Sequence, residues 1–263
     1  MTAPASSRLF LDHVRGSVTA AQKAAILCRH YETISREMQR VGTWRDQARL
    51  LDVGCGIGLY AEFWRSQGLH VTAVDVDVDQ VKLAARCANE RGLEIRYQVS
   101  SGDRLPFKDG AFDIVYANSL LEHVEDWQRC LSEWIRVLSP GGLLWVETTN
   151  VLCPRQGEFR WLPLYSWWPR PLKRLAVRLA KGPLPALVNY SSCPALHWFS
   201  FFQLERFCSS RGLVVRDRFD CLDPRSIGRV KNFIRQAAVG SRLGRCCAYL
   251  LISPLVVLAH RPR

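Results

Sequence analysis

The ten cysteines of this 263-residue chain lack the spacings that metal sites and disulfide frameworks use. No Cys-x-x-Cys pair occurs, so we expect reduced thiols and a reducing compartment. The first eight residues lack the apolar segment of a signal peptide. The longest apolar stretch, residues 246–259, is too short to span a bilayer and is interrupted by Ser253 and Pro254. These absences predict a cytoplasmic protein that is soluble, or peripheral on the inner face of the membrane.

Acidic residues are scarce in the second part of the chain. Residues 151–263 contain 5 Asp and Glu against 19 Lys and Arg, whereas residues 1–150 contain 19 against 17. The net charge of +12 is therefore concentrated in the second part. We expect a near-neutral, enzyme-like unit followed by a region that takes an anionic partner.

Strand-like apolar runs alternate with helix-like segments along the chain. This alternation predicts an α/β fold with a doubly wound, mostly parallel sheet, which binds its ligand at the carboxyl ends of the strands. Strands are expected over 49–53, 69–75, 94–99, 111–117, 143–149, 213–219 and 250–260. Helices are expected over 18–40, 60–67, 78–91, 127–138, 170–181 and 227–242, with a turn at 140–142.

Three glycines at alternate positions follow the first expected strand. Gly54, Gly56 and Gly58 allow a sharp turn on which a ligand can lie, next to the free N–H groups of a helix start. The third glycine comes one place earlier than in the dinucleotide fingerprint, where Leu59 stands instead. Asp75, at the end of the next strand, is placed to accept both hydroxyls of a ribose. Two alternatives remain open: a plain turn without a ligand, and Asp75 as the N-cap of the following helix.

Six short motifs follow one another in a fixed order. They are LDVGCGIG (51–58), VD (74–75), LPF (105–107), FD (112–113), LEHV (121–124) and RVLSPGG (136–142). Together they resemble the class I S-adenosylmethionine-dependent methyltransferases, especially the branch of the ubiquinone O-methyltransferases and menaquinone C-methyltransferases.

The resemblance implies a seven-stranded, Rossmann-like methyltransferase sheet with helices on both faces and an antiparallel final strand. The length and composition of the segment after residue 150 add an inserted cap to this fold. It divides the chain into an N-terminal helical lid (1–47), an S-adenosylmethionine-binding core (48–150), an aromatic and basic cap (151–196) and the C-terminal part of the fold (197–263).

The resemblance also implies the residues of a cofactor site. Gly54, Gly56 and Gly58 would pass under the methionine and ribose portions of S-adenosylmethionine, and Asp75 would hold the ribose diol. Ser101 stands where the family usually has an aspartate on the adenine amino group. The N–H of Gly102 would donate to the adenine ring, and Asn118 would lie near the methyl group.

Two histidines are candidates for the base that deprotonates a methyl acceptor, because the unperturbed pKa of histidine suits that task. His123 follows Glu122 in the LEHV motif, and His197 lies in a segment that resembles the substrate side of the family fold. Each has a structural alternative: His123 as a brace of the cofactor loop and His197 as a packed core residue. Ser119 replaces a glutamate of the quinone O-methyltransferase pattern, so we predict no bound metal.

An unusually long connection follows the expected strand at 143–149. Residues 151–204 contain ten aromatic residues and seven Lys or Arg against one acid. Its helix at 170–181 follows Trp167 and Trp168, an arrangement typical of helices that lie in a membrane interface. The alternatives are a lid packed on the core and a nucleic-acid surface; the latter is disfavoured because no recognised RNA-binding module is present. A helical wheel places Leu172, Leu175, Ala176 and Leu179 within about 100°, opposite Arg170, Lys173, Arg174, Arg178 and Lys181.

The sequence as a whole favours an S-adenosylmethionine-dependent methyltransferase that acts on a small apolar, aromatic or lipid-linked acceptor, with O-methylation slightly preferred. An anionic membrane surface is a candidate partner through residues 167–181. The first alternative is an inactive, membrane-associated binding protein, for which Ser101 and Ser119 in place of carboxylates are the evidence. The second is a nucleotide-dependent oxidoreductase, which is disfavoured because no tyrosine has a lysine four places later.

Overall fold

The computed structural model describes residues 31–41, 45–154, 159, 162, 164–187, 195–224 and 227–262. Residues 31–40 form a helix, which is the described part of the helix expected over 18–40. The rest of that helix, Trp161 and several other cap residues lie outside the described ranges.

A seven-stranded sheet forms the centre of the molecule, in the order β3-β2-β1-β4-β5-β7-β6. Its strands are parallel except for β7, which pairs antiparallel with both β5 and β6. The predicted sheet, with its antiparallel final strand, is confirmed. The strands are β1 (Arg49–Val53), β2 (His70–Asp75), β3 (Arg96–Val99), β4 (Phe112–Asn118), β5 (Leu138–Thr148), β6 (Val214–Asp217) and β7 (Leu255–His260).

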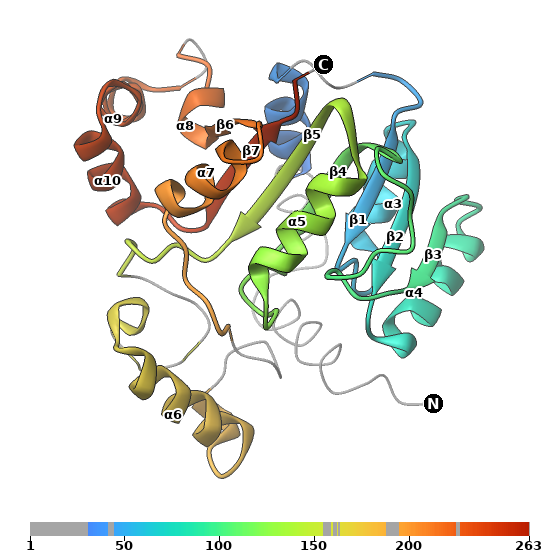
Figure 1. Ribbon diagram of the computed structural model, residues 1–263, viewed down its shortest axis with the longest axis horizontal. Helices are drawn as coiled ribbons and strands as arrows, with labels where there is room; N and C mark the ends of the chain where they lie inside the picture. Colours follow the sequence, from blue (N-terminus) through green and yellow to red (C-terminus); the bar gives the residue numbers. More distant parts are fainter. Residues whose placement is uncertain are drawn as a thin grey trace.

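Helices cover both faces of this sheet (Figure 1). Successive strand residues point to opposite faces, so Leu51 packs with Trp134 of α5, while Leu50 packs with Trp64 of α3 in a separate core. The α-helices after the N-terminal one are α3 (Leu59–Ser66), α4 (Val78–Glu90), α5 (Trp127–Val137), α6 (Arg170–Lys181), α7 (Phe201–Ser209), α8 (Arg218–Cys221), α9 (Arg229–Gly240) and α10 (Arg242–Leu251). Two short 3₁₀ helices are η1 (Tyr165–Trp167) and η2 (Pro185–Leu187).

Two expected elements differ from the structure. The turn expected at 140–142 is a bulged part of β5: β4 pairs at Leu138 and next at Leu143, while Gly141 and Gly142 exchange backbone hydrogen bonds with Arg261. The strand expected over 250–260 begins only at Leu255, because residues up to Leu251 form the helix α10. In the apolar stretch over 246–259, residues 246–251 are therefore helical and residues 255–259 belong to a buried strand.

The helix α6 lies beyond the carboxyl ends of the strands, at the lower left of Figure 1, with the hairpin of α9 and α10 at the upper left. Within the described ranges, no helix is long and apolar enough to cross a membrane.

Candidate active site

The glycine turn is bonded to the end of β2. The N–H groups of Gly54 and Cys55 both donate to the carbonyl of Val74, at 2.8 and 3.1 Å. Gly54 and Gly58 have φ angles of +76° and +83°, in the left-handed region that favours glycine. A Cβ at Gly58 would lie 2.5 Å from the hydroxyl oxygen of Tyr97, and one at Gly54 would lie 2.9 Å from Leu120. Both the backbone conformation and the neighbours therefore require glycine here.

Asp75 connects this turn to the start of α4. Its Oδ2 accepts from the N–H of Gly56 at 2.9 Å, and its Oδ1 accepts from the N–H of Asp77, also at 2.9 Å. The N-cap of α4 is Asp77, whose carboxylate accepts from the N–H groups of Asp79 and Gln80, so the N-cap interpretation of Asp75 is wrong. Each carboxylate oxygen of Asp75 has a second lone pair, and the side chain is partly exposed. It can accept from a ligand hydroxyl while it holds the turn.

Asp52 is a candidate site residue that the sequence interpretation missed. It is only 2% exposed, and its Oδ2 has no hydrogen-bond partner among the described residues. Burial and the nearby charge of Asp75 raise the pKa of Asp52 to about 8. An acid inside the apolar run Leu50-Leu51-Asp52-Val53 was the signal available in the sequence. A buried carboxylate behind the glycine turn suits a ligand with a positive charge.

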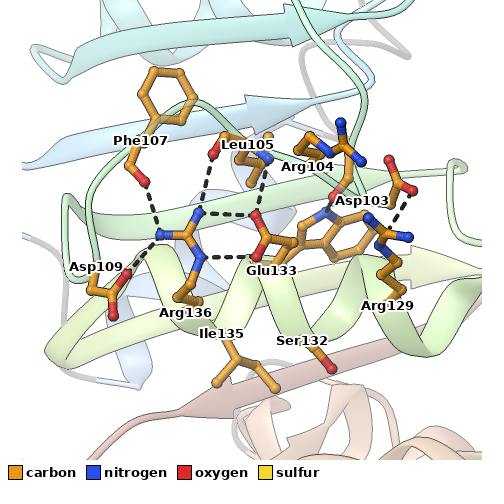
Figure 2. Close-up of polar contacts among 12 residues, drawn as sticks. Asp103, Arg104, Leu105, Phe107, Asp109, Arg129, Ser132, Glu133, Ile135 and Arg136 are labelled. Carbon is orange, nitrogen blue, oxygen red and sulfur yellow. Dashed lines mark hydrogen bonds and ion pairs between the residues drawn. The ribbon is translucent and has the colours of Figure 1, made fainter.

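The LPF motif is held in place by the arginine of the RVLSPGG motif. Figure 2 shows the Arg136 guanidinium between the loop and α5: it donates to the carbonyls of Leu105 and Phe107, at 3.1 and 2.8 Å, and to both oxygens of Glu133. Glu133 in turn accepts from the N–H of Leu105 at 3.0 Å. The bonds from Arg136 lower the pKa of Glu133. These contacts fix the loop that begins at Ser100, and they explain why two motifs far apart in the sequence occur together.

The same loop carries Ser101 and Gly102. The hydroxyl of Ser101 donates to Oδ1 of Asp103 at 2.6 Å, which leaves its own lone pairs available as acceptors. Asp103 also forms an ion pair with Arg129, at 3.6 Å. The carbonyl of Gly102 accepts from the indole N–H of Trp134 at 2.9 Å. A carboxylate thus lies beside Ser101, although Ser101 itself replaces the aspartate of the family pattern.

Asn118 and Ser119 end β4 at the same edge of the sheet. The hydroxyl of Ser119 donates to Oδ1 of Asn118 at 3.0 Å, and Ser119 has a φ of +50°. In the part of the chain that the structure describes, no group of three or more His, Cys, Asp or Glu side chains is arranged to hold a metal ion.

The two candidate bases meet at Glu122. His123 is its chain neighbour, and the backbone N–H of His197 donates to the Glu122 carbonyl at 3.1 Å. The Glu122 side chain is 3% exposed and accepts from the hydroxyl of Thr148 at 2.8 Å. Nε2 of His197 lies 3.3 Å from the carbonyl oxygen of Glu125; because a carbonyl can only accept, Nε2 carries the hydrogen in this contact. Nδ1 of a neutral His197 is then the basic nitrogen.

The orientation of α6 differs in part from the helical wheel. Ala176 and Ala180 face inward and pack in a small core with Phe159 and Tyr165. Lys173 also turns inward: its Nζ donates to the Ser166 carbonyl at 2.7 Å and lies 4.5 Å from the centre of the Trp198 ring. Burial lowers the pKa of Lys173.

Two leucines of α6 face outward. Leu172 and Leu175 are 48% and 51% exposed. Lys173 therefore does not lie with the exposed basic residues, and the apolar face of α6 is divided between the buried Ala176 and these two exposed leucines. Packing at Ala176 fits a lid and exposure at the two leucines does not, so the lid alternative stays open.

Comparison with known proteins places these features in a family context. Residues 51–146 match the family model described as a methyltransferase domain. A ubiquinone biosynthesis O-methyltransferase of Caulobacter sp. (strain K31) is 43% identical over 103 residues, which cover 39% of this chain and 41% of the relative. A malonyl-[acyl-carrier protein] O-methyltransferase of Erwinia billingiae is 31% identical over 138 residues, 52% of this chain and 53% of the relative. The chain thus spans about two fifths to half the length of these curated relatives.

A solved structure from Galdieria sulphuraria, described as a candidate sarcosine dimethylglycine methyltransferase, has a TM-score of 0.64 and 17% identity. It covers 98% of this chain and 99% of its own. At that identity the likeness shows the fold alone. The resemblance inferred from the sequence motifs is confirmed, and the chain carries a methyltransferase domain.

Proposed function

We propose that this protein transfers a methyl group from S-adenosylmethionine to an oxygen of a small apolar, aromatic or lipid-linked acceptor. The observation that carries the proposal is the glycine turn, with Asp52 buried behind it and Asp75 bonded to it. The match of residues 51–146 to a methyltransferase domain supports it.

The residues present fit the chemical groups of S-adenosylmethionine. The turn at Gly54, Gly56 and Gly58 offers a surface without side chains, since a Cβ would fill it. The ammonium of the bound methionine portion would lower the pKa of Asp52, and the ionised Asp52 would then counter that charge. Asp75 would accept from ribose hydroxyls. The donor, when bound, supplies a methyl group activated by its attachment to a sulfonium sulfur.

The adenine end of the donor would meet the loop that Arg136 holds. Ser101 would accept the adenine amino proton, Gly102 would donate from its N–H, and Asn118 would lie towards the methyl group. The hydroxyl of Ser101 donates to the carboxylate of Asp103, so its lone pairs remain available to accept from the adenine amino group.

The acceptor needs a residue that removes its proton during transfer. His123 and His197 are our candidates, and both are fixed through the backbone of the turn that contains Glu122. In His197 the proton would arrive at Nδ1, because Nε2 donates to Glu125. An oxygen acceptor is favoured because the two relatives described above are both named O-methyltransferases.

We place the acceptor at a membrane surface, with the protein in the cytoplasm and peripheral on the inner face of the membrane. The outward-facing Leu172 and Leu175 of α6 lie between the exposed Arg170, Arg174 and Arg178. Apolar side chains flanked by cations are typical of helices that lie in the membrane interface. Co-sedimentation with phosphatidylglycerol vesicles tests this part. Loss of binding in Arg174→Glu with Arg178→Glu supports it, and unchanged binding overturns it.

Calorimetric titration with S-adenosylmethionine and S-adenosylhomocysteine tests the donor site. Asp75→Asn should weaken binding about tenfold or more, because one charge-assisted acceptor is lost. The matched control is Asp77→Asn, two residues away, where asparagine remains a good N-cap and binding should stay within about twofold. No heat with either compound in the wild-type protein would overturn the enzyme proposal.

Mass spectrometry of lipid extracts, with and without active protein, identifies the acceptor through the mass of an added CH₂ group. Donor binding without any methylated product would favour the inactive binding protein. Ser119 in place of a glutamate is the observation that supports this second candidate.

A further inference from the structure

The two helices between β6 and β7 form a hairpin at the edge of the molecule. They are α9 and α10, joined through Ser241, whose side chain caps α10 by accepting from the N–H of Gly244 at 3.0 Å. Figure 1 shows the hairpin beyond the β6 edge of the sheet, at the opposite end from β3. This hairpin is separate from the cap helix α6 in the chain and has its own contacts with the sheet.

The inner side of the hairpin is firmly anchored. Ala238, Ala248 and Tyr249 are buried in the main core. The hydroxyl of Tyr249 donates to Asp217 at 2.8 Å, and Arg245 forms ion pairs with Asp217 at 3.2 Å and Asp220 at 2.9 Å. A buried network thus fixes the orientation of the hairpin. The side chains that point outward are therefore held in the solvent-exposed position by the fold.

The outer side of the hairpin is strongly apolar. In α9, Val230 and Phe233 are one helical turn apart and are 75% and 72% exposed. In α10, Leu243 and Leu251 are 76% and 72% exposed and lie on one face two turns apart, with the exposed Leu250 between them. Each such side chain gains free energy if it leaves water. Several together on one hairpin indicate a binding surface.

The charge around these side chains specifies the kind of partner. Residues 224–263 contain eight Lys and Arg and no Asp or Glu. Arg229 and Lys231 are exposed on either side of Val230 in the sequence, and Arg242 lies beside Leu243, with its guanidinium over the ring of Phe202. Two copies of such a surface would repel each other, whereas an anionic lipid surface attracts the cations and accepts the apolar side chains.

We propose that the α9–α10 hairpin is a second membrane-docking surface. It places Val230, Phe233, Leu243 and Leu251 at the boundary between headgroups and acyl chains, and Arg229 and Lys231 against lipid phosphates. This proposal rests on the proposed function in one respect: the surface would hold the protein where a lipid-linked acceptor resides. Vesicle binding itself requires no methyl donor.

The test is co-sedimentation of the full chain with vesicles of phosphatidylcholine and phosphatidylglycerol at low salt, compared with vesicles of phosphatidylcholine alone. Phe233→Ser with Leu243→Ser should weaken binding to the anionic vesicles about tenfold or more, because two apolar anchors are lost without a change of charge. Val230→Ser should weaken it severalfold. The matched control Val78→Ser makes the same change at the start of α4, at 45% exposure, and should bind like wild type.

Circular dichroism and thermal melting check that the variants fold, which we expect because the substituted side chains are exposed. Unchanged anionic-vesicle binding in the double variant overturns the proposal, as does wild-type protein that stays in the supernatant. A wild-type dimer that the double variant converts to a monomer would assign the surface to a second copy instead. Calorimetry with S-adenosylhomocysteine separates the two proposals: the hairpin variants should bind it normally, whereas Asp75→Asn should lose it and still bind vesicles.

Discussion

The strands and loops around the glycine turn and the segments that follow β5 use charge in opposite ways. In the first region, charged side chains bond to one another: Arg136 with Glu133 and Asp109, and Arg45 and Arg49 with Asp113. In the second, Arg174, Arg178 and Lys231 are exposed on helices that also expose leucine, valine or phenylalanine. In the first region, ion pairs between side chains stabilise the candidate site. In the second, exposed cations remain available to an anionic partner.

This difference follows from composition. Nearly equal numbers of acids and bases in residues 1–150 allow the charges to pair within the fold. The 19 bases of residues 151–263 have only five acids to pair with, and Asp217 and Asp220 already bond Arg245. The excess cations therefore remain at the surface. Four predictions test this contrast.

The largest effect is expected at Gly58 of the glycine turn. Gly58→Ala combines a left-handed backbone with a close approach to Tyr97 and Ala84, and should cost roughly 3 to 5 kcal/mol in the free energy of unfolding. Gly212→Ala is the matched control in the second region: its φ is +80°, but nothing lies within 4 Å of the added Cβ. It should cost about 1 kcal/mol. Urea denaturation measures the free energy of unfolding of both variants. Equal losses would contradict close packing around Gly58 of the glycine turn.

An effect of comparable size that depends on pH is expected at Asp52. Burial and Asp75 raise its pKa from 3.8 to about 8, so the folded state binds its proton more tightly than the unfolded state and wild-type stability falls as pH rises between these values. Asp52→Asn removes this loss. The free energy of unfolding of the variant should exceed that of wild type by an amount that grows by up to about 1.4 kcal/mol per pH unit across that window. Below pH 4 the two should differ little.

Chemical denaturation at several pH values tests the Asp52 prediction, and a constant difference from pH 4 to 9 would refute it. The same variant should bind S-adenosylmethionine more weakly, since asparagine cannot ionise when the ammonium of the ligand is bound beside it. Asp79→Asn, on the first turn of α4, is the control for both measurements.

A smaller effect is expected at Asp113. Burial alone would raise its pKa, but the hydrogen bonds and charge of Arg49 outweigh burial and hold the pKa well below 3.8. Its contribution to stability is therefore present above about pH 4 and is lost as the pH falls further. Asp113→Asn should cost about 2 kcal/mol at pH 7 and progressively less in acid. Asp109→Asn, whose side chain is 81% exposed, should cost under about 1 kcal/mol, and equal costs would argue against an internal network.

The smallest effect is expected on the outer side of α6. Leu175→Gln should change the free energy of unfolding by less than about 0.5 kcal/mol, because that side chain is already half exposed. Ala176→Gln, the next residue, should cost about 1 to 3 kcal/mol, because it forces a long polar side chain into the core around Tyr165. A large cost at Leu175 would mean that this leucine packs on the protein.

The sequence predicted the fold and the glycine turn well because both depend on local patterns. Alternating apolar runs located the strands, and the bounds of α6 were predicted as observed, since Pro169 and Gly182 flank a clear helical period. The apolar stretch over 246–259 was misinterpreted because a half-buried helix and a buried strand are both apolar, and no periodicity separates their junction.

The side-chain partners in the site could not be read from the sequence. Lys173 has the spacing of a basic surface face, yet Trp198 and the Ser166 carbonyl draw it inward. Asp103 forms an ion pair with Arg129 of α5, 26 residues later, because the loop packs against that helix (Figure 2). Such contacts depend on how separate elements pack, and a helical wheel contains no information about them.

The position of β7 sets an order of events during synthesis. This strand lies between β5 and β6 and pairs with both, yet the ribosome makes it after both of them. Until residues 255–260 emerge, a nascent chain has an open edge at β5, and premature pairing of β6 with that edge would block the place that β7 needs. The turn of Gly54, Gly56 and Gly58 and its neighbours on β2 and β4 are made long before this. The part of the sheet around the glycine turn can thus form before β7 is available to complete the other edge.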